Sequence, residues 1–107
     1  MALTRQFRET IQERIQRDPK FRNALLQEAI ECLLTDDIQT GKAIFRDFIN
    51  GTIGFESLAE QTEISSKSLM RMFSPSGNPT ATNLFHVIAN LQDAEGISLK
   101  VKVSKAA

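Results

Sequence analysis

The segment FESLAEQTEISSKSLMRMF, from Phe55 to Phe73, limits the possible folds more than any other part of the chain. Apolar and small residues recur in it at helical spacing twice, on either side of a break at residues 63–65. Ala59 supplies the small side chain that two steeply crossing helices need where their backbones meet, and a buried Ile64 would hold the corner. The pattern predicts two short helices joined by a tight turn. Such a pair forms either a helix-turn-helix motif or an ordinary helical hairpin.

Cap signals and apolar spacing predict further helices before and after this segment, over residues 4–17, 19–34, 37–50 and 80–92. Thr4 can cap the first of these helices. Asp18 and Pro19 are the N-cap and first-position residues that start the second. Two prolines and a glycine at residues 75–79 exclude a helix there and predict a defined loop. We therefore expect an all-α chain, and 107 residues suffice for one domain.

One segment near the C-terminus has a different period. After a turn predicted at residues 93–96, the sequence Ile-Ser-Leu-Lys-Val-Lys-Val at residues 97–103 alternates apolar and polar residues strictly, which is typical of a half-buried strand. A lone strand needs a partner for its backbone groups. We expect it to pair with its copy in a homodimer, through Ile97, Leu99, Val101 and Val103. Pairing with the sheet edge of another protein, or an extended unpaired tail, are the alternatives.

The composition is that of a soluble globular protein, with 41% hydrophobic and 24% charged residues. No apolar run is long enough to cross a bilayer, and the first residues contain no apolar signal-peptide core. Cys32 is the single cysteine, so it cannot form an internal disulfide. These features predict a protein of a reducing compartment, the cytoplasm, that does not contact a membrane.

The formal net charge is zero, but the charges are segregated along the sequence. Basic residues outnumber acidic ones in residues 1–22 and 64–107, and acidic residues outnumber basic ones in residues 23–63. Such a molecule can present a basic side to phosphate and an acidic side to a basic partner, although solvated helix faces also produce this pattern.

No catalytic, cofactor or metal site is expected. The sequence has no glycine-rich phosphate loop and no nucleophile with a base at a recognisable spacing. His86 has no second histidine or cysteine at ligand spacing, and Cys32 falls on the apolar face of its helix. We therefore expect that the protein is not an enzyme.

The order of these elements, with the motifs LAEQTEIS at residues 58–65, SL at 68–69 and SGNPT at 76–80, resembles the Cro/CI-like (XRE) family of DNA-binding domains. It looks most similar to the HigA-like antitoxins of addiction modules, in which a helical region precedes the helix-turn-helix. Residues 67–80, KSLMRMFSPSGNPT, are the most specific part of the resemblance. Glu63 departs from the family pattern, which usually has a glycine in the turn.

The resemblance implies a lambda-repressor-like helix-turn-helix bundle in a single domain. Residues 1–35 would be an N-terminal helical extension, residues 36–92 the DNA-binding core, and residues 93–107 a turn and the C-terminal strand or tail. It also implies a transcriptional regulator, the antitoxin of a type II toxin–antitoxin module that represses its own operon. The implied partners are double-stranded DNA with a palindromic operator, a second copy of the chain and a small basic toxin.

If the second helix of the pair enters a major groove, its exposed side chains face the bases. Arg71 can donate two hydrogen bonds to a guanine edge, and Lys67 can contact guanine or phosphate. The complete set of predicted DNA contacts is Gln61, Ser66, Lys67, Ser68, Met70, Arg71, Ser76, Asn78 and Thr80. The alternative is a protein-interaction module that keeps the helix-turn-helix fold without binding DNA, which Glu56, Glu60 and Glu63 favour.

Overall fold

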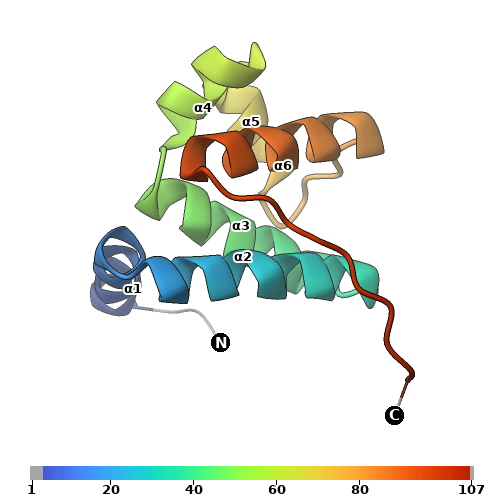
Figure 1. Cartoon of the computed structure of the whole chain (residues 1–107). Helices are drawn as coiled ribbons and strands as arrows, with labels where there is room; N and C mark the ends of the chain where they lie inside the picture. Colours follow the sequence, from blue (N-terminus) through green and yellow to red (C-terminus); the bar gives the residue numbers. More distant parts are fainter. Residues whose placement is uncertain (1–3, 107) are drawn as a thin grey trace.

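Six helices make up the regular structure in the computed structural model, which describes residues 4–106 (Figure 1). They are α1 (Arg5–Arg17), α2 (Pro19–Leu34), α3 (Ile38–Gly51), α4 (Phe55–Thr62), α5 (Ser66–Met72) and α6 (Ala81–Glu95). The all-helical expectation is thus correct for the described chain.

The predicted cap residues start the helices. The Thr4 hydroxyl oxygen accepts a hydrogen bond from the backbone N–H of Phe7, and the Asp18 carboxylate accepts one from Phe21, both at 3.1 Å. Pro19 occupies the first helical position of α2, where its missing N–H has no intrahelical partner to lose. Short side-chain signals therefore set where these helices begin.

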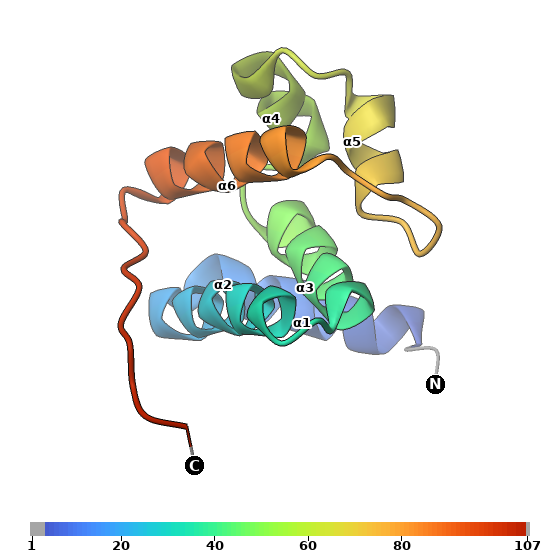
Figure 2. The ribbon, with the colours of Figure 1, turned by 90° about the vertical axis from the view of Figure 1, so that its right-hand side faces the viewer.

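Helix α3 lies at the centre of the molecule, between a layer of α1 and α2 and a layer of α4, α5 and α6 (Figures 1 and 2). Phe45, Phe48 and Ile49 are fully buried and contribute to one apolar cluster with residues of α2, α4, α5 and α6. Gly41 lies against Leu33 and the backbone of α2, and Gly51 lies against Ile15 of α1. These glycines, which weaken a helix in isolation, let three helices approach closely.

The last helix is longer than the sequence predicted. Residues 93–95 continue α6 instead of forming a turn, and Gly96 ends it in the left-handed conformation, at φ 66°. Glu95 is held there by Arg22, whose Nε lies 2.7 Å from the carboxylate Oε2, and both side chains are mostly buried. An ion pair between residues distant in sequence thus stabilises the last turn, which a local sequence pattern cannot reveal.

The predicted C-terminal strand is wrong. No strand is present among residues 4–106, and residues 97–106 follow an extended path beside α2 without regular structure (Figure 1). Ile97 and Leu99 pack on the apolar cluster, and the N–H of Leu99 donates to Gln92 Oε1 at 2.8 Å. Val101 and Val103 are 87% and 93% exposed. Two of the alternating apolar side chains, Ile97 and Leu99, thus anchor the tail on the helices. The tail forms no strand, because the described chain offers no neighbouring strand for it to pair with.

The turn between α4 and α5 imposes an unfavourable backbone conformation on Glu63. Its φ of 60° and ψ of 23° are left-handed, as at many helix ends, and its N–H donates to the carbonyl oxygen of Ala59. Glycine reaches this conformation without a steric cost, whereas for a residue with a Cβ the conformation costs about 1 kcal/mol. The position therefore has the backbone of a glycine turn despite its glutamate.

We predict that Glu63→Gly raises the free energy of unfolding by about 1 kcal/mol relative to Glu63→Ala. Both variants remove the carboxylate, so the comparison isolates the left-handed backbone. Chemical denaturation followed by circular dichroism measures the difference. Equal stability of the two variants would show that the turn carries no such strain.

Candidate functional site

A surface groove of about 420 Å³ lies between α5, the loop at residues 73–80 and the start of α6. We call it the α5–α6 groove. Its lining residues are Ile64, Ser68, Arg71, Met72, Ser76, Gly77, Asn78, Pro79, Thr80 and Asn83. Polar side chains thus come together from three segments of the chain on an open surface.

Five of the residues predicted to contact DNA line this groove, namely Ser68, Arg71, Ser76, Asn78 and Thr80. Lys67 and Met70 are exposed on α5, and Ser66 is half-buried at its first position. Gln61 lies apart, because it lines a different crevice with residues of α3 and α6. The structure therefore groups most of the predicted set around α5 and places one member elsewhere.

The cationic groups of α5 are available for an external ligand. Lys67 and Arg71 are exposed, and within residues 4–106 their side chains form no ion pair or hydrogen bond. Part of the groove's polar lining is engaged locally. The Ser65 hydroxyl donates a hydrogen bond to the hydroxyl oxygen of Ser68 at 2.9 Å. The Thr80 hydroxyl oxygen accepts one from the backbone N–H of Asn83. A hydroxyl in such a position can still contact a phosphate oxygen.

Lys42 of α3 holds the loop that forms one wall of the groove. Its side chain is only 3% exposed, and its Nζ donates to the carbonyl oxygens of Ser74, Pro75 and Gly77 at 3.0, 3.2 and 2.7 Å. An ammonium has three donors, so these acceptors satisfy it and offset the cost of burying its charge. The loop is therefore fixed from beneath by a buried cation.

Two neighbours of Lys42 on α3 bind the same loop. Gln39 Nε2 donates to the carbonyl oxygen of Pro75 at 3.1 Å, and Arg46 Nη1 donates to that of Phe73 at 3.3 Å. Residues 39, 42 and 46 share one side of α3. We did not expect these positioning residues from the sequence, because α3 also carries the polar residues Thr40, Asp47 and Asn50 and the carbonyl partners lie in a distant loop.

The loop also packs tightly on the end of α5. A Cβ atom at Gly77 would overlap the carbonyl oxygens of Arg71 and Met72, so only glycine fits there without a backbone shift. The Ser74 hydroxyl donates to the carbonyl oxygen of Arg71 at 2.7 Å. The segment that carries Ser76 and Asn78 is therefore held in a fixed position relative to Arg71.

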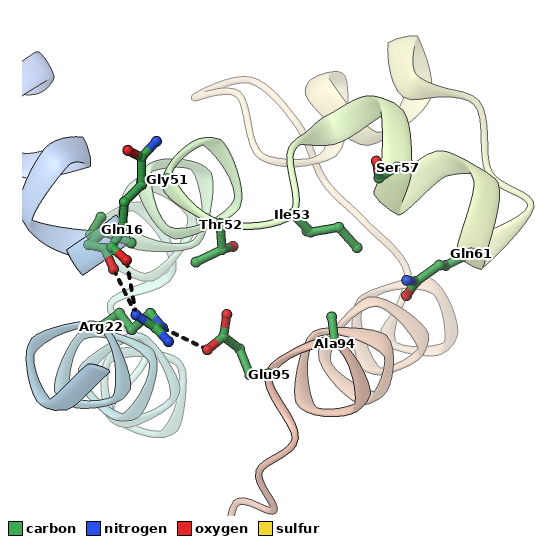
Figure 3. A pocket seen from close by; sticks show the side chains of 10 residues that line it. Gln16, Arg22, Gly51, Thr52, Ile53, Ser57, Gln61, Ala94 and Glu95 are labelled. Atoms are coloured by element: carbon green, nitrogen blue, oxygen red, sulfur yellow. Dashed lines mark hydrogen bonds and ion pairs between the residues drawn. The ribbon is translucent and has the colours of Figure 1, made fainter. Parts of the chain in front are cut away.

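A second crevice, of about 570 Å³, lies where α1, α2, α3, α4 and α6 meet (Figure 3). Its charged groups satisfy each other. The guanidinium of Arg22 donates to Glu95 and to the carbonyl oxygens of Ile15 and Gln16. Since neither charge is free for a ligand, we assign this crevice a structural role, and Gln61 lies at its edge.

Cys32 and His86 have local structural contacts. Burial and the nearby carboxylates of Asp37, Glu28 and Glu31 raise the pKa of the Cys32 thiol, which disfavours the nucleophilic thiolate. His86 Nε2 lies 3.0 Å from the carbonyl oxygen of Thr62, so the imidazole donates to the end of α4. Neither residue belongs to the α5–α6 groove.

Two kinds of site are missing from the part of the chain that the structure describes. Residues 4–106 contain no group of three or more His, Cys, Asp or Glu side chains placed to hold a metal ion. None of the described helices is long and apolar enough to cross a membrane.

We predict that Lys42→Met lowers the free energy of unfolding by about 2 kcal/mol, because it leaves three carbonyl oxygens without their charged donor. Amide hydrogen exchange of Gly77, whose N–H donates to Ser74, should accelerate in this variant. Lys67→Met, at an exposed position, is the control and should change neither quantity. Unchanged exchange in Lys42→Met would mean that the loop does not depend on the ammonium.

Comparisons of the chain with protein-family models, with curated proteins and with solved structures found no match. The function therefore has to be argued from the α5–α6 groove and its surroundings.

Proposed function

We propose that this protein binds double-stranded DNA sequence-specifically and acts as a transcriptional regulator, with α5 as the recognition helix. The observation that carries the proposal is the arrangement of the α5–α6 groove. Arg71 and Ser68 of a short helix stand beside Ser76, Asn78 and Thr80 of a rigidly held loop. A helix with exposed polar side chains fits the major groove, and adjacent loop groups suit phosphate oxygens.

The residues have distinct roles in this proposal. Arg71 donates two hydrogen bonds to a guanine edge, and Lys67 contacts a base or a phosphate. Met70, which is 49% exposed, packs on a thymine methyl group. Lys42 contacts no DNA and acts by fixing the loop that carries Ser76 and Asn78.

One copy of the chain offers few positive charges near the groove. Lys67 and Arg71 are exposed there, but so are Glu60 and Glu63. Binding is therefore strengthened by a second copy, which places a second α5 about 34 Å away on a palindromic operator. A homodimer is part of the proposal for this reason.

We expect Arg71→Ala to weaken binding to the promoter fragment of the protein's own gene by about 10- to 100-fold, because a bidentate base contact contributes about 1–3 kcal/mol. Lys67→Ala should reduce the slope of log K against log salt by about 0.9 for each phosphate that the side chain no longer neutralises. Arg17→Ala, which removes an exposed charge from the last turn of α1, is the matched control.

Fluorescence anisotropy at several salt concentrations measures these effects. Wild-type affinity of Arg71→Ala at physiological salt would exclude α5 as the recognition helix. Failure of the wild type to bind any duplex at low salt, in a selection from random sequences, would exclude DNA binding. It would favour the second candidate, a protein-interaction module, for which the exposed carboxylates of Glu56, Glu60 and Glu63 argue.

The proposal includes an antitoxin role, in which the protein binds a small basic toxin and represses their shared operon. It rests on the family resemblance and on acidic side chains near the end of α2. Glu28, Glu31, Asp36 and Asp37 are exposed there. A basic protein attracts such a surface electrostatically.

A short basic protein encoded by the neighbouring gene should co-purify with this chain, and the chain should protect cells from the toxicity of that protein. We expect the double substitution Glu28→Lys and Glu31→Lys to weaken the complex. The matched control, Glu56→Lys with Glu60→Lys, reverses the same charge on α4 and should leave the complex intact. A neighbouring product that binds neither the wild type nor the variants would remove the antitoxin role and leave a stand-alone regulator.

A further inference from the structure

The second half of α2 and the turn that follows it carry acidic side chains and no basic ones. Residues 23–41 contain no Lys or Arg, and they have four exposed carboxylates, on Glu28, Glu31, Asp36 and Asp37. The last turn of α2 also has no basic residue to complement the negative end of the helix dipole. Burial, and then the carboxylates of three of these residues, raise the pKa of the Cys32 thiol, so their fields overlap there. We call this region the acidic end of α2.

The C-terminal tail brings positive charge to the acidic end of α2. Residues 97–106 contain three lysines and no Asp or Glu. In Figure 1 the tail passes beside the later part of α2, and a groove of about 390 Å³ lies between them. Lys100 and Lys102 of the tail line this groove together with Glu31 of α2. Opposite charges thus share one groove, where they attract each other.

The tail is held at its start and not beyond it. Ile97 and Leu99 pack on the apolar cluster, and the N–H of Leu99 donates to Gln92 Oε1 at 2.8 Å. Within the described part of the chain, residues 100–106 form no hydrogen bond and no ion pair. The attraction between exposed charges is weak and falls as salt rises. The lysines can therefore leave the acidic end of α2 without breaking a bond that the structure contains.

We propose that the tail is a displaceable shield over a binding surface, the groove between α2 and the tail, which takes a basic segment of a partner protein. The tail lysines repel such a segment and compete with it for the carboxylates of Glu28 and Glu31. Ile30 and Leu34 line the same groove, and Leu34 is 73% exposed, so an incoming apolar side chain is buried there as well. The inference rests on the proposed antitoxin role for the nature of the partner, and it adds the surface and its regulation.

The test uses the full chain and a fluorescein-labelled decalysine peptide, whose binding is followed by fluorescence anisotropy at low salt. The tail variant combines Lys100→Gln, Lys102→Gln and Lys105→Gln. It should bind the peptide about 10-fold more tightly than the wild type, a factor that corresponds to about 1.4 kcal/mol shared among three exposed charges. All three lysines are exposed, so the circular dichroism spectrum should not change.

The matched control removes three exposed cations from other surfaces, on α1 and at the start of α2. It combines Arg5→Gln, Arg17→Gln and Lys20→Gln, and it changes the net charge by the same amount as the tail variant. Its affinity for the peptide should stay close to that of the wild type. An equal gain in both variants would overturn the proposal, since net charge alone would then explain it. A peptide that binds neither the wild type nor the tail variant would overturn it as well.

A further pair of proteins tests whether the acidic end of α2 is the surface that the tail shields. In a chain with Glu28→Gln and Glu31→Gln, the tail substitutions should no longer raise the affinity for the peptide. The reason is that the effects of interacting residues are not additive. A gain that persists undiminished would place the shielded surface elsewhere and reject the proposal.

The decalysine peptide tests the shield without a natural partner, so the shield and the antitoxin role fail in distinguishable ways. A gain in the tail variant, together with a neighbouring gene product that binds neither protein, would uphold the shield and remove the antitoxin role. A neighbouring basic protein that binds the wild type and the tail variant equally well would do the reverse.

Discussion

Burial of α3 on two sides is the constraint on which the rest of the structure depends. Phe45, Phe48 and Ile49 are fully buried, and their cluster includes residues of every helix from α2 to α6. Each large buried apolar side chain stabilises the fold by about 1.5–3 kcal/mol. The same helix carries Lys42, so the core element also fixes the loop beside the candidate site.

Internal and external charges have different roles in this molecule. Arg22 and Lys42 are mostly buried, and their donors are satisfied by Glu95 and by backbone carbonyl oxygens. Lys67 and Arg71 are exposed and bind no other side chain among residues 4–106. A count of basic residues along the sequence cannot separate these two groups. Of these two groups, only the exposed cations are available to an external ligand.

The structure brings the predicted residues together where the helix and the loop are both local features. The loop after α5 packs on the end of that helix at Gly77, and Ser76 and Asn78 line the same groove as Ser68. Gln61 was grouped with them from sequence proximity, but α4 directs it toward α6. Lys42 was overlooked because its partners are carbonyl oxygens more than thirty residues away, which have no signature in the sequence.

The sequence by itself determined the helices, because caps such as Thr4 and Asp18 and the spacing of apolar residues act within a few residues of chain. Glu63 was singled out only through the family resemblance, as a departure from a glycine in the turn, and the structure gives it the left-handed backbone conformation. Only the tertiary structure decided the extra residues of α6, the hydrogen bonds from Lys42 to the loop at residues 74–77 and the path of the tail. Alternating apolar residues can anchor on a sheet or on helices, and which of these surfaces exists depends on the fold of the whole chain.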